Sequence, residues 1–254
     1  MKEFFKYMFA SMLGFFLVYI IIFFLMVAMV ASLASLADKE AKVSDNSVLY
    51  MKLNKEIFDR TQKDPFINLG PAFDMEQSLG LDDLLANLKK AASDDRIKGV
   101  LLDLSHVPAS YATIDEIRKG LLEFKNSGKW VMSFADSYTQ GSYFLSSSAD
   151  RLFMNPSGLL EFKGIGLELM FLKGTLEKLD IEAQIIRHGK YKSAAEPLMY
   201  DRMSADNREQ LEAYINSSWD YMVSEVAEGR GLSVELLNKA ADELETFDAD
   251  RSLE

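Results

Sequence analysis

The chain opens with a long apolar segment, and shorter apolar and amphipathic stretches alternate after it. No charged side chain occurs from Tyr7 to Ala37, a run of 31 residues. As a helix this run would extend about 46 Å, more than the bilayer's hydrocarbon core of about 30 Å. The apolar part of a cleaved signal peptide is only about 7–15 residues long. We therefore predict a short tip and a retained transmembrane anchor over residues 1–37. Small residues at Ala31, Ala34 and Ala37 leave cleavage as the alternative.

Charges on the two sides of the apolar run indicate its orientation. Lys2 and Lys6 precede it, whereas residues 38–46 form a polar linker that carries both signs of charge. Basic residues favour the cytoplasmic side of a membrane. We expect the N-terminus in the cytoplasm and the bulk of the chain outside it.

Beyond residue 46, strand patterns and helix patterns take turns. Short apolar runs predict buried strands, and apolar residues spaced three and four apart predict helices. The predicted strands are Ser47–Leu53, Ile97–Leu104, Trp130–Ala135, Arg151–Met154, Leu159–Phe162 and Ile181–Ile186. The predicted helices are Leu81–Ala92, one opened by a capping box at Thr113 and Glu116, Gln140–Ser148, Leu169–Leu179, Ala205–Gly229 capped by Ser204, and one after Ser233. Ile57–Gly80 is predicted as a loop region. This alternation predicts an α/β domain with a largely parallel sheet over residues 47–254.

Composition excludes several classes of site. The chain of 254 residues has no cysteine, so it can form neither a disulfide nor a thiolate metal site. Its two histidines, His106 and His188, are too few for a histidine-rich metal centre, and neither stands beside a Gly-x-Ser-x-Gly motif. The net charge of −11 disfavours nucleic acid as a partner. We expect no metal and no organic cofactor.

One polar stretch, from Arg187 to Pro197, carries two lysines. A lysine has an unperturbed pKa of about 10.4 and acts as a base near neutral pH only if burial or a neighbouring cation lowers that value by roughly 3 units. Taken by itself, a lysine in a polar loop is usually a solvated surface charge. The residues alone leave both interpretations open for Lys190 and Lys192.

Several motifs occur in a recognisable order along nearly the whole chain. After the apolar run they are Ile97–Val100, Asp136–Phe144, Asn155-Pro156, Gly189–Ala194 and Glu196-Pro197. With these motifs the chain resembles the N-terminal half of the signal peptide peptidase A (protease IV) family, which are membrane-anchored Ser-Lys peptidases of the ClpP/crotonase superfamily. The resemblance implies a ClpP/crotonase-like domain, a serine endopeptidase that degrades cleaved signal peptides or other peptides, a homo-oligomer, and contact with membrane lipid. It also implies a bacterial inner membrane, with the domain facing the periplasm.

The resemblance assigns roles to individual residues. It places the family's general-base lysine on Lys192, with Lys190 as the alternative, and it gives Glu196 an orienting role. Gln140 stands where the family's other half has its nucleophilic serine. The segment Ser105–Ser110 lacks the Gly-Gly that would donate to an oxyanion, and Pro108 has no N–H to offer.

These departures predict half of a catalytic dyad. We expect a truncated chain that supplies the lysine, needs a C-terminal half bearing the serine, and is inactive alone. The alternative is a catalytically inactive, membrane-anchored scaffold. A crotonase-type acyl-CoA enzyme is disfavoured by the apolar N-terminal run. Ser142, Ser146, Ser147 and Ser148 could offer a local nucleophile, but small residues that pack a helix on a sheet explain them better.

Overall fold

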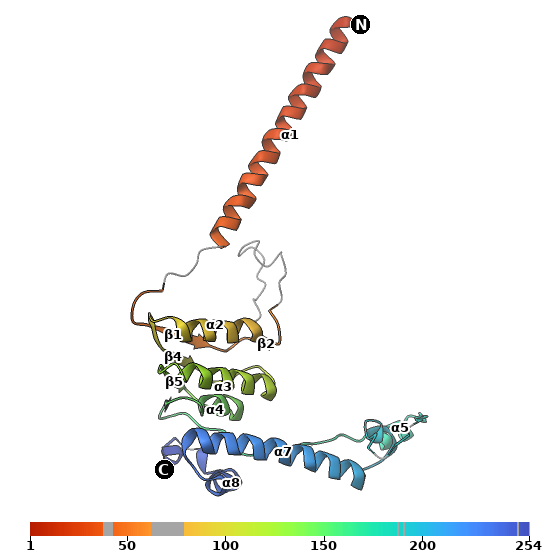
Figure 1. Ribbon diagram of the computed structural model, residues 1–254. Coiled ribbons are helices and arrows are strands. Elements are labelled where there is room, and N and C mark those ends of the chain that lie inside the picture. The colour runs from red at the N-terminus through yellow and green to blue at the C-terminus, as the bar shows by residue number, and fades with distance from the viewer. Residues whose placement is uncertain (38–42, 62–78, 187, 190, 248, 254) are drawn as a thin grey trace.

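The chain forms an α/β domain preceded by one long N-terminal helix (Figure 1). This computed structural model describes residues 1–37, 43–61, 79–186, 188–189, 191–247 and 249–253. The strands are β1 (Ser47–Lys52), β2 (Ile57–Phe58), β3 (Leu79–Gly80), β4 (Ile97–Asp103), β5 (Trp130–Ala135) and β6 (Arg151–Met154). The helices are α1 (Lys2–Ala37), α2 (Leu81–Ser93), α3 (Tyr111–Lys125), α4 (Gln140–Ser146), α5 (Lys173–Lys178), α6 (Glu196–Met199), α7 (Ala205–Arg230) and α8 (Val234–Asp242). Two 3-10 helices, η1 (Glu245–Phe247) and η2 (Arg251–Leu253), follow.

The main sheet has four strands in the order β1-β4-β5-β6, and every pairing is parallel. Helix α3 connects β4 to β5, and α4 connects β5 to β6. Helices α2, α3, α4 and α7 lie side by side in that order (Figure 1). The predicted α/β class with a parallel sheet and flanking helices is therefore confirmed.

The core lies between the sheet and this helical layer. Val100 and Leu102 of β4 and Ile117 and Leu121 of α3 are fully buried. On the other face of β4, Gly99 faces the Trp130 ring of β5, and a Cβ at this position would lie 2.2 Å from a ring atom. Only glycine fits under that ring, because the contact is far shorter than carbon atoms tolerate.

A buried arginine joins three helices. The Arg118 side chain, 1% exposed, forms an ion pair with Glu225, donates to the Glu225 carbonyl at 2.7 Å and donates to the Ser147 hydroxyl at 3.3 Å. Its guanidinium also lies 5.4 Å from the centre of the Phe144 ring. A buried charge is tolerated only when it is paired and hydrogen-bonded. These contacts fix α7 against α3 and α4.

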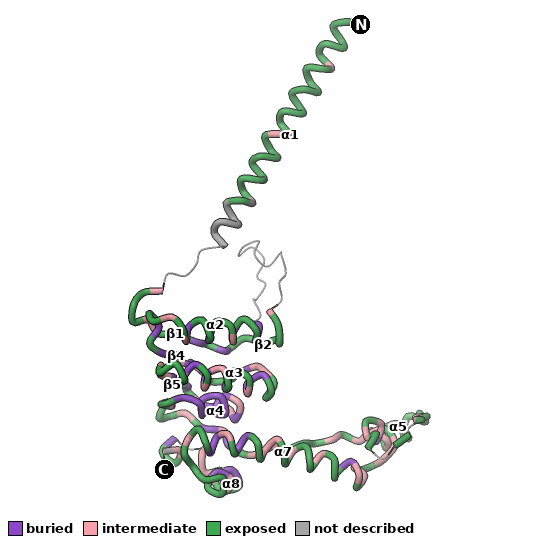
Figure 2. The backbone as a smooth tube through the Cα atoms, in the orientation of Figure 1, coloured by how far each residue is buried: buried purple, intermediate pink, exposed green. Residues whose placement is uncertain are grey.

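The apolar N-terminal run is one helix, α1. Its part Lys2–Met29 is, by length and composition, the one described segment apolar enough to cross a membrane, and none of it is buried. Figure 2 shows α1 exposed along nearly all of its described length. The predicted linker, residues 38–46, lies partly outside the described residues, and so does most of the predicted loop Ile57–Gly80. Two short strands, β2 and β3, pair at the ends of that loop.

Two boundary predictions are wrong. Helix α3 begins three residues earlier than expected, since Ser110 caps it and its hydroxyl accepts the Thr113 N–H at 3.2 Å. The predicted helix Leu169–Leu179 is shorter, and only α5 forms.

Two predicted strands are also wrong. Leu159–Phe162 forms no strand, since Leu160 makes only an isolated bridge with Tyr138. Ile181–Ile186 has no regular secondary structure and pairs with no described strand, and Ile186 is fully exposed. The cause lies in its position, since the segment that carries α5 projects at the end of α7 farthest from the sheet (Figure 1). An alternating apolar pattern becomes a strand only where a neighbouring strand can bond to it.

Candidate active site

The predicted base Lys192 is exposed, in the turn between α5 and α6. This turn belongs to the segment that carries α5 and α6, which projects at the far end of α7 (Figure 1). Gly189, just before it, has φ = 110°, a conformation that side chains with a Cβ rarely adopt. The alternative base, Lys190, lies outside the described residues. The motif that carries the resemblance therefore presents Lys192 on the surface of the domain.

Short-range contacts hold this segment together. The Leu172 N–H, just before α5, donates to the Pro197 carbonyl in α6 at 2.7 Å. Lys173 of α5 forms an ion pair of 3.3 Å with Asp201, which follows α6. Helices α5 and α6 therefore pack as one unit, and Lys192 lies on the turn between them.

Glu196 attaches that unit to α7. Its carboxylate, 1% exposed, accepts the Ser204 O–H at 2.6 Å, the Ser204 N–H at 3.2 Å and the Asn207 side-chain N–H at 3.1 Å. Ser204 in turn caps α7 by accepting the Asn207 N–H at 3.1 Å. A negative charge is favourable at a helix N-terminus. This geometry fits the orienting role expected of Glu196. That role came from the family resemblance, and no local pattern in the sequence identifies Ser204 and Asn207 as the partners of Glu196.

Gln140, at the place expected for the serine, is used as a structural clamp. Its side-chain oxygen accepts the Lys163 N–H at 3.0 Å, and its side-chain nitrogen donates to the Gly164 carbonyl at 3.1 Å and to the Tyr111 hydroxyl at 3.4 Å. Gln140 is buried at the first turn of α4. An amide cannot serve as a nucleophile of this type, and this one ties residues 163–164 to α4. The projecting segment that carries Lys192 lies well apart from α4 (Figure 1).

The serines in and just after α4 are packing residues, as expected from small residues that pack a helix on a sheet. All four are buried. Ser142 donates to the Ser105 carbonyl at 3.1 Å, and Ser146 shares a 2.8 Å hydrogen bond with Ser133. The two that follow donate to carbonyls three residues earlier, Ser147 to Phe144 and Ser148 to Leu145. Each hydroxyl is occupied and shielded from a substrate.

The segment between β4 and α3 offers little to an oxyanion. The Ala109 N–H is bonded to the Val107 carbonyl at 2.9 Å, and Pro108 has no N–H. The Ser105 carbonyl accepts the Thr139 N–H at 3.4 Å. This segment links β4 to α4 and β2 rather than forming a donor pocket.

The titratable groups near α4 include two buried tyrosines, whose role is structural. Burial raises the pKa of Tyr138 to about 12, although hydrogen bonds with Ser133 and Ser146 act to lower it. Burial also raises the pKa of Tyr143. Both phenols stay neutral near pH 7 and contribute packing. Among the described residues, no group of three or more His, Cys, Asp or Glu side chains is arranged to hold a metal ion.

Comparison with known proteins identifies relatives. The family model of Peptidase family S49 matches residues 123–254. Protease 4 of Haemophilus influenzae is 34% identical over 151 residues, which cover 59% of this chain and 25% of that protein. Protease 4 of Salmonella typhi is 32% identical over 169 residues, covering 66% and 27%. The chloroplastic serine protease SPPA of Arabidopsis thaliana is 31% identical over 190 residues, covering 75% and 27%. The chain thus matches about a quarter of the length of these relatives.

A solved structure also matches, at a low score. A monofunctional enoyl CoA isomerase from M. smegmatis has a TM-score of 0.31 and 14% sequence identity, with 80% of this chain and 90% of that chain covered. The fold assignment therefore rests on the parallel sheet itself. The family model covers just over half of the chain, and the protease 4 and SPPA relatives are 31–34% identical to it. The chain belongs to peptidase family S49, and its resemblance to signal peptide peptidase A is confirmed.

Proposed function

We propose that this chain is the lysine-bearing part of a membrane-anchored serine endopeptidase that degrades cleaved signal peptides. The observation that supports this most is the contrast between two sites. Lys192 is exposed on an anchored projecting segment, whereas Gln140 is buried and engaged where the serine would stand. Lys192 is exposed, and Gln140 occupies the position of the nucleophile. Both observations are consistent with a dyad whose serine comes from another part of the polypeptide.

In the proposed mechanism, neutral Lys192 takes the proton of a serine hydroxyl on the C-terminal half. The serine oxygen attacks the peptide carbonyl, and the lysine returns the proton to the leaving amine. Water then hydrolyses the acyl-enzyme, with the lysine again as base. A partner surface that covers the turn would remove water from the lysine, and such desolvation lowers a lysine's pKa. No metal or organic cofactor takes part.

The projecting segment also supports assembly. It exposes large apolar side chains, and contiguous exposed apolar surface marks interaction sites. The most exposed of them are Met170, Leu179, Ile181, Ile186 and Tyr191. In this proposal they contact the C-terminal half or another copy in a homo-oligomer.

Membrane attachment completes the proposal. Residues 1–37 serve as tip and anchor, 38–46 as linker, and 47–254 as the peptidase domain. The apolar helix α1, with Lys2 and Lys6 at its start, supports a bacterial inner-membrane protein whose domain lies in the periplasm.

The test is complementation. The chain is combined with a C-terminal half bearing the serine, and cleavage of a leucine-rich signal peptide is measured. Lys192→Ala is expected to lower the cleavage rate about 100-fold or more, as loss of a general base does. Lys178→Ala, at an exposed lysine of α5, is the matched control and should cleave normally. Unchanged cleavage by Lys192→Ala in an intact complex would refute the assignment.

The engaged Gln140 favours a second candidate, an inactive scaffold that only assembles with partners. The same experiment separates the two. A wild-type complex that forms but never cleaves supports the scaffold.

A further inference from the structure

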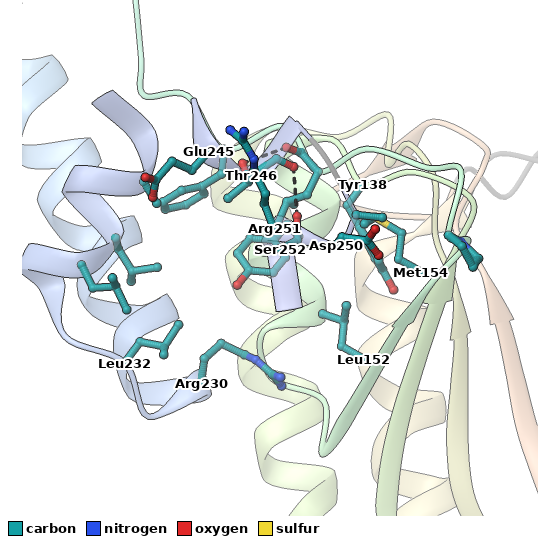
Figure 3. Close-up of a pocket in the computed structure, with 18 residues that line it drawn as sticks. Tyr138, Leu152, Met154, Arg230, Leu232, Glu245, Thr246, Asp250, Arg251 and Ser252 are labelled. Carbon is teal, nitrogen blue, oxygen red and sulfur yellow. Dashed lines mark hydrogen bonds between the residues drawn. The ribbon is translucent and has the colours of Figure 1, made fainter. Parts of the chain in front are cut away.

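A cavity of about 410 Å³ is lined by Arg230, the last residue of α7, and so lies at the end of α7 opposite to the projecting segment (Figure 1). Figure 3 shows the side chains that line it. Small-molecule sites commonly measure roughly 300–1,000 Å³ and combine apolar walls with a few polar groups. Here Leu152 and Met154 of β6 form one wall, and Leu232 and Leu237 form another. Helix α7 has 26 residues and is therefore about 39 Å long, so the cavity is remote from Lys192.

One arginine stands at the edge of these apolar walls. Arg230, the last residue of α7, is half-buried and lies between Leu232 and Leu152 (Figure 3). Its guanidinium donates to the Ala149 carbonyl at 3.4 Å. Among the residues that the structure describes, none forms an ion pair with it. A guanidinium presents a planar set of donors that matches a carboxylate.

The other charged groups of the cavity are placed elsewhere. Glu245 lies at the opposite end from Arg230, and Lys239 is 3.9 Å from it (Figure 3). Asp250 lies on the side of the cavity that Tyr138 lines, and Arg251 lies toward the end of the cavity that Glu245 lines (Figure 3). Arg230 is therefore the positively charged side chain that lies next to the aliphatic walls of the cavity.

We propose that this cavity binds an aliphatic carboxylate, with the carboxylate on Arg230 and the hydrocarbon part against the leucine walls. Two sources share this chemistry, namely a fatty acid and the free C-terminus of an apolar peptide. Binding requires neither Lys192 nor a serine, so the site is independent of the proposed peptidase function.

The test uses the full chain in phosphatidylcholine liposomes. The Trp219 ring lies 5.3 Å from the ring of Phe162, which lines the cavity, so tryptophan fluorescence reports on occupancy. The ligands are octanoate, acetyl-Leu-Leu with a free carboxylate, and acetyl-Leu-Leu amide. Arg230→Gln removes the proposed head-group contact, and Arg208→Gln, at an exposed arginine near the start of α7, is the matched control.

We expect saturable binding of at least one of the two carboxylates. The amide should bind at least about tenfold more weakly than the carboxylate that binds. Arg230→Gln should lose about tenfold in affinity, while Arg208→Gln should bind as the wild type does. Preference for octanoate assigns the site to fatty acids, and preference for the peptide acid assigns it to peptide ends. A cavity-filling Ala240→Phe should abolish binding.

Three results would each overturn the proposal. They are no saturable fluorescence change with either carboxylate, equal affinity of Arg230→Gln and wild type, and undiminished binding by Ala240→Phe. Circular dichroism confirms that each variant is folded, and because all variants share the same liposomes, partitioning of octanoate into lipid cancels between them.

Discussion

Replacing Glu196 by alanine should release the projecting segment from α7. The carboxylate accepts hydrogen bonds from the N–H and the O–H of Ser204 and from the side chain of Asn207, and the residue is 1% exposed. Hydrogen bonds to charged groups contribute roughly 1.5–3 kcal/mol each, but water would enter the vacated space and replace part of them. We therefore expect a local cost of about 3 kcal/mol. The nearly isosteric Glu196→Gln keeps one oxygen acceptor and should cost less.

The assay is hydrogen exchange of the first turn of α7. An opening made easier by about 3 kcal/mol speeds exchange through that opening roughly 100-fold. Strand β4 is the internal reference, because its core residues should exchange as in the wild type. Glu212→Ala removes an exposed carboxylate that pairs with Arg208 at 3.5 Å, and it should have little effect.

One outcome would refute this reasoning. If Glu196→Ala leaves exchange at the start of α7 unchanged, or changes it no more than Glu212→Ala does, the Glu196 contacts do not hold the segment. If the exchange rises as expected, the same variant should also slow cleavage in the complementation assay.

Two further predictions concern the domain. Arg118→Met leaves Glu225 without its buried partner and should cost about 3 kcal/mol in urea unfolding, whereas Arg208→Met at an exposed site should cost almost nothing. Burial acts to raise the pKa of Asp150, but hydrogen bonds from Lys125 and the Val131 N–H outweigh it and lower that pKa. A lowered carboxyl pKa stabilises the fold above the unfolded value of about 3.9, and this contribution disappears as pH falls toward the folded pKa. The stability gap between the wild type and Asp150→Asn should therefore be present at pH 7 and shrink below about pH 4, and equal gaps at both pH values would contradict it.

Strands β5 and β6 could be predicted because their sequence pattern and their environment agree. β5 and β6 have the predicted bounds, since each is a short apolar run flanked by turn residues and each pairs with a neighbour. Helix α7 was predicted from Ala205 to Gly229 with Ser204 as its cap, and both the start and the cap are observed. In these elements, the local sequence pattern and the tertiary position favour the same structure.

Predictions failed where tertiary position decides. Ile181–Ile186 has a strand pattern, but it projects away from the sheet and finds no described partner. Thr113 and Ser110 are both plausible caps, and only the observed hydrogen bond distinguishes them. The three contacts of Gln140 join residues more than twenty positions apart in sequence, and so no local pattern reveals its role as a clamp.

The central claim is that Lys192 activates a serine carried by another half. The most direct measurement is the rate at which a fluorophosphonate labels that serine in the assembled complex, because labelling requires an activated hydroxyl and no substrate turnover. We expect rapid labelling with the wild type and with Lys178→Ala, and labelling slowed about 100-fold or more with Lys192→Ala. Equal labelling by the wild type and Lys192→Ala, in complexes of equal yield, would contradict it.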